Sequence, residues 1–504
     1  MKNKKFVWIN LILVFPIIFY TFHLLFFWIL TTTDSLFMWS LAEFFRSGKY
    51  WVGHPYYFTT PSTMEPPLYS LLILLVESFP RSDIVLHFIQ IGALFLAGFL
   101  IFQILKRILN RNTALIVLTV FLFIPAHWIY VSTVMTEMVS LVFMSFYVYL
   151  VFLIISEKKQ YFFHFAVIFS AVMTLQRYNF VVYYFLSLFY FIFFINKKTK
   201  YYLSIFISLI ILFSWILINY QLTGAWGLSN SEGKHIWERI VWQDGLLPSE
   251  KDPSLMELKK LTGRKNLHVP WWFIESWIRS SKYSTSETEI SILMGKTAIS
   301  ALRYNPVKYI INTPINYLKI HNNGETFHSN LAKYGEANIR KKCSQMGNLN
   351  ICQPIISADF SGRIWQTLVF LAEWYYQNMP GYINYIILFP SLIAAFFSRK
   401  KYIICLAGMY LAGSLLPVLI EDPSPRYLYP LYPVKIILMT YFIVYGIKAL
   451  KLHGLTSVES NNALRPELKS VRSEKTSLHP KSSLTRGISH RRIKIRKNLF
   501  LQKK

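Results

Sequence analysis

The sequence predicts an all-α polytopic membrane protein with about ten transmembrane helices, two surface helices in the first outer loop and a large mixed outer loop. Of its 504 residues, 54% are hydrophobic and only 15% are charged, which is too apolar for a soluble chain of this length. The apolar residues occur in blocks of roughly 20, the length of a helix that crosses a bilayer. The short connections between the blocks are alternately rich and poor in Lys and Arg, which is typical of polytopic membrane proteins.

The first apolar block follows Lys2, Lys4 and Lys5 and resembles the start of a signal peptide. Its apolar stretch is too long for such a peptide and no small-x-small cleavage site follows, so it is interpreted as a membrane anchor. The fifth and sixth blocks are short and are joined by the tight turn QRYN. The predicted spans are residues 6–30, 83–105, 113–132, 138–156, 161–176, 179–195, 201–219, 380–397, 402–420 and 429–449.

The charges of the connections predict the orientation. With the N-terminus inside, the short cytoplasmic segments hold 14 Lys/Arg and one Glu, whereas the short outer segments hold five Lys/Arg. Basic residues concentrate on the cytoplasmic side of membrane proteins. Both termini are therefore predicted to be cytoplasmic and the large loops extracytoplasmic. The compact chain and its basic tail suit a bacterial plasma membrane.

Four regions follow from these spans. They are an N-terminal membrane module (1–219) with its first outer loop (31–82), a large extracytoplasmic loop (220–365), C-terminal transmembrane helices (366–450) and a basic cytoplasmic tail (451–504). The tail holds 14 Lys/Arg against three Glu, is Ser-rich and poor in aromatic residues, and is predicted to be disordered. Because the net charge of +28 lies largely in this tail and in short loops, it favours a lipid bilayer over nucleic acid as the partner.

The first outer loop is predicted to contain two helices along the membrane surface. One runs over residues 35–46, with Asp34 as its N-cap. The other starts at Pro66–Pro67, where proline is tolerated, and ends near Phe79 because Pro80 follows.

The second outer piece, residues 220–365, is a polar loop of mixed charge. Its segment GKTAISALRYNPVKYIINTPINYLKIH has the apolar periodicity of an amphipathic helix, predicted to break at Pro306 and again at Pro314. Cys343 and Cys352 share this loop on an oxidising side, so a local disulfide is compatible with the sequence. Cys405 is expected to be a packing residue, and the aromatic stretch 367–377 is expected to lie at the interface.

Charged side chains far apart in sequence fall at one membrane level on the outer side. Polar groups at that level often mark substrate pathways. Each also has a structural alternative: Asp34 and Glu137 can cap helices, Arg177 can reach lipid headgroups, and Arg426 can pair with a neighbouring acid. The residues at this level are Asp34, Glu65, Glu137, Arg177, Glu421, Asp422 and Arg426.

Five features in this order resemble the GT-C membrane glycosyltransferases. Within them, the chain is most similar to the branch of the protein O-mannosyltransferases and aminoarabinose transferases, glycosyltransferase family 39. The features are the Asp after the first span, the SGKYW end of the surface helix followed by EPPLYS, the turn TLQRYNF, the segment ALRYNPVKYIINTPINYLKI, and PRYLYPLYP before the last span. The chain departs from its relatives in having Pro66–Pro67 where many have Lys-Pro, and Glu137 where some have Asp.

The resemblance implies an inverting sugar transfer from a polyprenyl-phosphate donor to an acceptor hydroxyl on the extracytoplasmic face. The departing phosphate is a stable anion, so one carboxylate suffices as the general base, and Asp34 is the candidate. Arg177 and Arg426 are the candidates for binding the donor phosphate. Glu65, Glu137 and His54 are further candidates for the donor or metal site, with Glu65 able to hold Mg²⁺ or Mn²⁺.

Two other classes of protein share parts of this pattern. An O-antigen polymerase or ligase also has many spans and a large outer loop, but offers less reason for an early Asp34–Glu65 pair. A lipid or glycan transporter (flippase) is expected to carry charges within its spans and two corresponding halves. The predicted spans hold few charges away from their ends, and no half repeats the other. The sequence leaves the sugar and the acceptor, whether protein, lipid or glycan, unidentified.

Overall fold

The structure is a computed structural model, and every regular element in its described part is a helix. Residues 1–444 form one compact unit and residues 445–504 form a second. The predicted all-α membrane fold is confirmed, because every described regular element is a helix and five of the helices are long and apolar enough to cross a membrane. The described residues are 14–25, 33–48, 62–194, 198–281, 285–322, 375, 379–398, 400–421 and 424–463. Outside them lie His54, Cys343, Cys352, Asp422, the stretch 367–377 apart from Tyr375, and the chain from 464 onward.

Five described helices are long and apolar enough to cross a membrane, and each coincides with a predicted span. The last of them combines a 3-10 turn with the helix that follows it. They are α4 (Ser82–Ile108), α7 (Glu137–Ile155), α10 (Tyr202–Thr223), α20 (Lys401–Ile420), and Pro425–Ile447, which joins η6 (Pro425–Leu431) to α21 (Tyr432–Ala463).

The other five predicted spans coincide with shorter apolar helices. Span 113–132 is shorter than predicted, because α5 ends at Leu122 and Pro125 starts a separate short helix, α6 (Pro125–Tyr130). The shorter helices are Val14–Leu25, α5 (Arg111–Leu122), η1 (Gln160–Phe162) with α8 (Phe163–Gln176), η2 (Tyr178–Phe180) with α9 (Val181–Phe194), and α18 (Pro380–Ile383) with η5 (Asn384–Leu388) and α19 (Phe389–Phe396).

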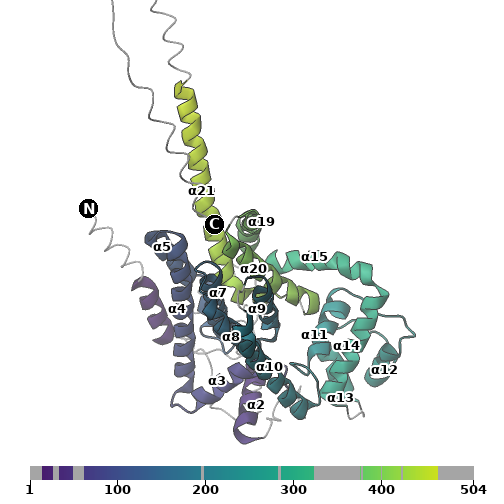
Figure 1. Ribbon diagram of the computed structural model, residues 1–504. Coiled ribbons are helices and arrows are strands. Elements are labelled where there is room, and N and C mark those ends of the chain that lie inside the picture. Colours follow the sequence, from purple (N-terminus) through teal and green to yellow (C-terminus); the bar gives the residue numbers. More distant parts are fainter. Residues whose placement is uncertain are drawn as a thin grey trace, which may run out of the picture. The chain divides into compact units, whose positions relative to one another are not determined.

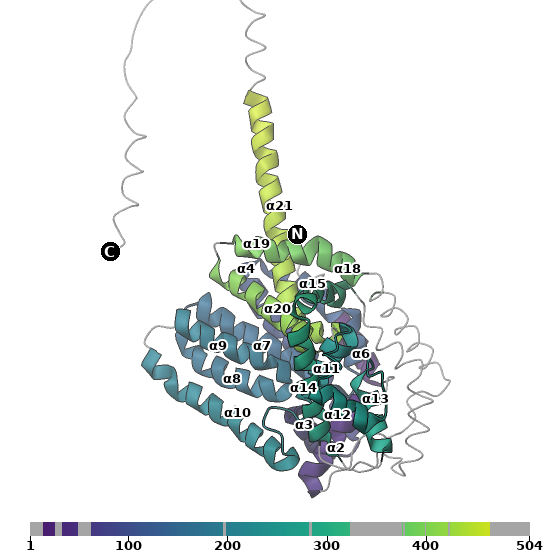
Figure 2. The same ribbon diagram turned by 90° about the vertical axis from the view of Figure 1, so that its right-hand side faces the viewer.

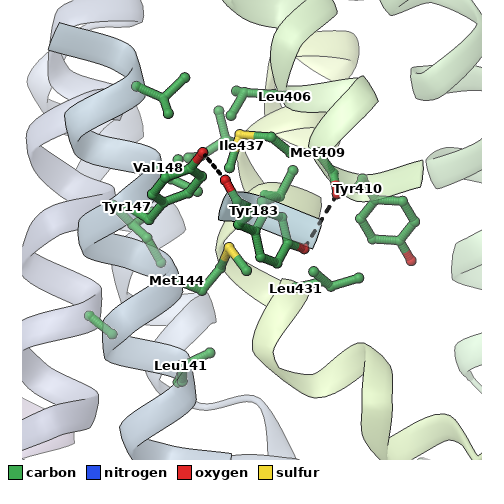
Figure 3. Close-up of a cluster of buried hydrophobic side chains, with 14 of the residues drawn as sticks. Leu141, Met144, Tyr147, Val148, Tyr183, Leu406, Met409, Tyr410, Leu431 and Ile437 are labelled. Carbon is green, nitrogen blue, oxygen red and sulfur yellow. Dashed lines mark hydrogen bonds between the residues drawn. The ribbon is translucent and has the colours of Figure 1, made fainter. Parts of the chain in front are cut away.

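Buried side chains of the long and short helices form one apolar core. Figure 2 shows α7, α8, α9 and α10 running side by side. Hydrogen bonds of two buried tyrosines join α7, α9 and α20 (Figure 3). The hydroxyl of Tyr147 in α7 donates to the Tyr183 carbonyl in α9 over 3.0 Å. The Tyr183 hydroxyl in turn donates to the Met409 carbonyl in α20 over 3.4 Å. A Cβ at Gly413 would lie 1.9 Å from the Tyr183 hydroxyl, so glycine is required for α20 to approach α9 this closely.

The two predicted surface helices are present. α3 (Pro67–Glu77) has proline at its first position and ends before Pro80, as predicted. α2 (Thr33–Ser47) begins earlier than expected, so Asp34 is not its N-cap but its second residue, where a carboxylate still favours a helix N-terminus. Both helices lie together near one end of α4 (Figure 1), and Met38, Tyr69 and Leu86 share a small apolar core.

Residues 232–304, here called the loop subdomain, have a hydrophobic core of their own, which the expectation of a polar loop did not include. Trp237, Leu258, Ile274 and Met294 are buried in this core. α11 and α14 cross at glycine: a Cβ at Gly233 would lie 1.8 Å from a backbone oxygen of α14. The helices of the subdomain are α11 (Glu232–Trp237), the π-helix η4 (Glu238–Gln243), α12 (Pro253–Thr262), α13 (Trp271–Ser280) and α14 (Glu287–Tyr304).

The amphipathic helix of the second outer piece breaks once, not twice. α14 ends at Tyr304 and α15 (Pro306–Asn322) begins at Pro306, as predicted, but α15 continues through Pro314. A proline inside a helix removes one backbone hydrogen bond. Packing next to the proline offsets this loss: the Thr313 hydroxyl donates to the Tyr309 carbonyl over 2.9 Å and accepts from the Arg239 guanidinium over 3.4 Å.

The segments that link consecutive helices contact one another in two groups, one at each end of the helix bundle. At one end, Glu157 forms ion pairs with Arg107 and with Lys159, which joins two connections predicted to be cytoplasmic. The connections predicted to be outer meet at the other end, here called the site end, through the contacts described next. The predicted alternation of the connections therefore agrees with the packing.

Candidate active site

Arg177 lies in the turn between α8 and α9 and forms a buried ion pair. Its guanidinium lies 3.4 Å from Glu137, the first residue of α7, and the exposed fractions of the two side chains are 8% and 2%. Thr136 and Gln176 reinforce the contact, since the Gln176 amide donates to the Thr136 carbonyl over 3.3 Å. Two residues predicted to share a membrane level are thus direct neighbours.

Arg426 reaches the same place from the connection between α20 and α21. The guanidinium carbon of Arg177 lies 5.2 Å from the ring centre of Tyr427, and that of Arg426 lies 5.5 Å from the same ring. Such distances are typical of cation–π contacts. Both predicted phosphate-binding residues therefore meet at Tyr427, although 249 positions separate them in the sequence.

Glu65 belongs to a segment held against the turn of Arg177. The hydroxyl of Tyr178 donates to the Thr63 carbonyl over 3.0 Å and to the Glu65 carbonyl over 3.3 Å. Glu65 is half-buried and precedes α3 by two residues. The first outer loop, the α8–α9 turn and the start of α7 therefore meet at the site end.

Thr63 ties this segment to α10 and to Asn230, which lies just before the loop subdomain. Its hydroxyl donates to the Asn219 amide oxygen over 2.5 Å and accepts from the Asn230 backbone N–H over 3.1 Å. Its own backbone N–H donates to the Asn230 side chain over 3.2 Å. Thr63 is fully buried, so every one of these polar groups depends on its partner.

We expect Thr63→Val to lower the free energy of unfolding by about 1–3 kcal/mol, because it leaves the buried backbone N–H of Asn230 without its acceptor and removes one of the two hydroxyls that donate to the Asn219 amide oxygen. Thr63→Ser should restore most of the loss. Thermal unfolding in detergent measures the effect. Thr119→Val is the matched control, since the Thr119 hydroxyl bonds only its own helix, at Leu115. Equal unfolding temperatures for Thr63→Val and Thr119→Val would contradict the structural role.

The backbone around Asp34 is anchored near Glu137. Asp34 lies in the first turn of α2, and the hydroxyl of the next residue, Ser35, donates to the Val134 carbonyl over 2.6 Å. Val134 precedes Glu137 by three residues. The start of α2 is thus joined to the connection that leads into α7, whereas the side chain of Asp34 lies outside the described part of the structure.

His235 of α11 is a member of this region that the sequence did not indicate. Burial lowers the pKa of His235 below its ordinary value; the Glu421 carboxylate opposes this change, and Lys234 and Arg426 add to it. A direct contact joins the loop subdomain to the site end: the hydroxyl of Ser62, in the first outer loop, donates to the Glu287 carboxylate over 3.3 Å. No motif signals His235, because a single histidine in a polar loop has no characteristic spacing.

The described residues contain no group of three His, Cys, Asp or Glu side chains that could hold a metal ion. A cation at Glu65 would have to use ligands beyond that part of the chain, such as the Asp34 side chain, together with the phosphate itself. The binding of Mg²⁺ or Mn²⁺ therefore stays a prediction.

Residues 64–218 match the family model described as dolichyl-phosphate-mannose-protein mannosyltransferase. The matched residues begin one position before Glu65, include Glu137 and Arg177, and end within α10. This part of the chain, about a third of its length, is similar to that family of glycosyltransferases. The match therefore favours the enzyme over the transporter among the classes that the sequence left open.

Two solved structures resemble this chain over most of its length. One is ArnT from Cupriavidus metallidurans bound to undecaprenyl phosphate, with 10% identity and a TM-score of 0.36, covering 86% of this chain and 77% of that one. The other is the apo state of the same protein, with 10% identity and a TM-score of 0.35, covering 87% and 78%. No curated protein matches the chain by sequence.

Proposed function

We propose that this chain is a GT-C glycosyltransferase, which transfers a sugar from a polyprenyl-phosphate donor to an acceptor hydroxyl at the extracytoplasmic face of a bacterial plasma membrane, with inversion. The observation that carries the proposal is the meeting of Arg177 and Arg426 at Tyr427, next to Glu137. Two guanidinium groups at the end of an apolar bundle suit a phosphate carried by a lipid, because guanidinium binds phosphate through paired hydrogen bonds. The name of the matched family describes a donor of this chemical class.

In the proposed reaction, the acceptor oxygen attacks the anomeric carbon of the sugar from the face opposite the phosphate. The bond from that carbon to the phosphate oxygen breaks, and the phosphate leaves with the bonding electrons. Asp34 takes the proton of the acceptor hydroxyl, which is general-base catalysis. No protein acid is needed, because the leaving group is already a stable anion; a glycosidase, in contrast, protonates its leaving oxygen.

The arginines have distinct tasks in this scheme. Arg177 is held by the buried Glu137 carboxylate, so its guanidinium is pre-oriented and costs little entropy when phosphate binds. Arg426, in a connection between helices, completes the phosphate contact. Glu65 lies beside the donor site, where it contacts the sugar or shares a divalent cation with Asp34; such a cation would neutralise phosphate charge.

Arginine replacement tests the phosphate contact. We expect Arg177→Gln and Arg426→Gln each to raise the KM for a polyprenyl-phosphate sugar at least tenfold in proteoliposomes, with Lys at either position retaining more activity than Gln. A lysine keeps the positive charge but cannot donate the two parallel hydrogen bonds with which a guanidinium binds phosphate. Arg46→Gln is the control, since Arg46 is exposed and forms a surface ion pair with Glu43. Arginine variants with an unchanged KM would contradict the assignment.

The donor itself is identified in membranes. Polyprenyl-phosphate sugars are extracted from cells that make them, with and without the active chain, and quantified. Consumption of one donor with release of a polyprenyl phosphate supports transfer of a single sugar. Growth of a lipid-linked glycan by whole repeat units would instead support the polymerase or ligase alternative. A chelator added during the assay tests the role of a divalent cation.

A further inference from the structure

α15 packs against a membrane-spanning helix rather than lying in a water-filled loop. It leads from α14 toward α20 (Figure 1). Residues later in α15 contact residues earlier in α20. The two helices therefore run antiparallel, and α15 extends from the end of α20 to its middle. The contacts are Tyr309 to the Leu419 carbonyl (2.6 Å), Tyr317 to the Ser414 hydroxyl (3.0 Å) and His321 to the Tyr410 hydroxyl (3.1 Å).

The face of α15 turned away from α20 is apolar and exposed. The positions follow the period of an α-helix, which makes them one continuous stripe. A stripe of this kind on a soluble surface marks an interaction site. The stripe consists of Val307 (67% exposed), Ile310 (67%), Ile311 (57%), Ile315 (47%) and Leu318 (45%).

The stripe continues onto the next apolar helices. The Asn384 amide donates to the His321 carbonyl over 2.5 Å, and the Tyr385 hydroxyl donates to the Leu318 carbonyl over 3.5 Å. Ile386 and Ile393, in the predicted span formed by α18, η5 and α19, are 66% and 61% exposed. The exposed stripe of α15 therefore adjoins side chains that a membrane-spanning segment presents to lipid.

We propose that α15 is inserted among the acyl chains of the leaflet at the site end, as an oblique helix that enters the bilayer along α20. Lipid covers the stripe, and Lys308, near the outer end of α15, directs its ammonium group toward the headgroups over its long stem. Residues 306–322 thus belong to the membrane part of the chain, although they were expected to lie in the extracytoplasmic loop. The inference concerns lipid contact and does not depend on the proposed reaction.

Fluorescence quenching in nanodiscs tests the insertion. In a background with Cys343, Cys352 and Cys405 replaced, single cysteines at Ile311 and Ile315 are labelled with bimane. We expect doxyl-labelled phosphatidylcholine to quench both at least twofold, and iodide in the water to quench neither. Phe99→Cys on α4 is the lipid-facing control, since Phe99 is 52% exposed in a candidate span. Met256→Cys on α12 is the aqueous control, with 55% exposure.

Other outcomes would overturn the proposal. Quenching by iodide as strong as that of Met256→Cys would place α15 in water. Protection from both quenchers would show that protein covers the stripe, whether the segment that follows Asn322 or a second copy of the chain. Because no variant is assayed for transfer, failure of this inference and failure of the proposed function are distinguishable.

Discussion

Replacing Asp34 by asparagine is expected to lower the rate of sugar transfer by about 10²–10⁴-fold while the protein still folds and binds its donor. This is the usual contribution of a general base. Asparagine keeps the size and hydrogen-bonding capacity of aspartate but cannot accept the acceptor proton at neutral pH. The rate is measured in proteoliposomes with saturating donor, so the effect should appear in kcat rather than in the KM for the donor.

Glu43→Gln is the matched control for Asp34→Asn. It also neutralises a carboxylate of α2, but Glu43 lies further along the helix in an ion pair with Arg46. We expect less than a twofold change in rate. If Asp34→Asn keeps the full rate, Asp34 acts only in the first turn of α2, where it favours the helix N-terminus.

Lys234→Met is expected to destabilise the loop subdomain by about 3–5 kcal/mol, because it leaves the buried Glu287 carboxylate without its counter-charge. The Lys234 ammonium lies 2.6 Å from Glu287 and 3.0 Å from Glu275, and all three side chains are at most 1% exposed. Arg279 also pairs with Glu275, at 2.5 Å. Hydrogen exchange of α11 and α14 in detergent measures the loss.

Lys259→Met on α12 is the control, since Lys259 pairs at the surface with the exposed Glu250. Surface ion pairs contribute about 0–1 kcal/mol to the free energy of unfolding. The amide hydrogens of this variant should therefore exchange at nearly the same rates as those of the unchanged protein. Equal exchange rates for Lys234→Met and Lys259→Met would show that the buried cluster does not stabilise the subdomain.

The same cluster predicts a pH dependence. Burial by itself favours the neutral amine, but Glu287 and Glu275 together hold the pKa of Lys234 above its ordinary value of 10.5. A raised lysine pKa stabilises the folded state below that value and loses its effect as the pH rises through the folded-state pKa. We therefore expect the loop subdomain to lose stability above about pH 10.5, and Lys234→Met to lack this transition.

The positions of the spans were predictable because they depend on local signals. Block length and hydropathy located the membrane helices, and Pro67 marked the start of α3. Arg177 and Arg426 were found because a charge next to an apolar block is conspicuous. The contact of Arg177 with Tyr427 was not predictable, since it depends on how the turn after α8 packs against the connection between α20 and α21.

The loop subdomain was largely missed for a related reason. Its core residues lie in short helices separated by polar turns, so no apolar run is long enough to stand out. Thr63, Asn219 and Asn230 carry no motif, and their role comes from three segments meeting in space. α15 passes through Pro314 because contacts with Arg239 and α20 outweigh a local helix-breaking preference.

The shortness of α8 and α9 has a consequence for the membrane itself. With the 3-10 turns η1 and η2 that precede them, the two segments Gln160–Gln176 and Tyr178–Phe194 are about 27 Å long at 1.5–2.0 Å per residue, whereas the hydrocarbon core of a bilayer is about 30 Å thick. Lipids beside these helices must relieve this hydrophobic mismatch by local thinning. Such thinning would bring the headgroup layer toward the turn of Arg177, where the phosphate of the proposed donor could meet the guanidinium without leaving that layer.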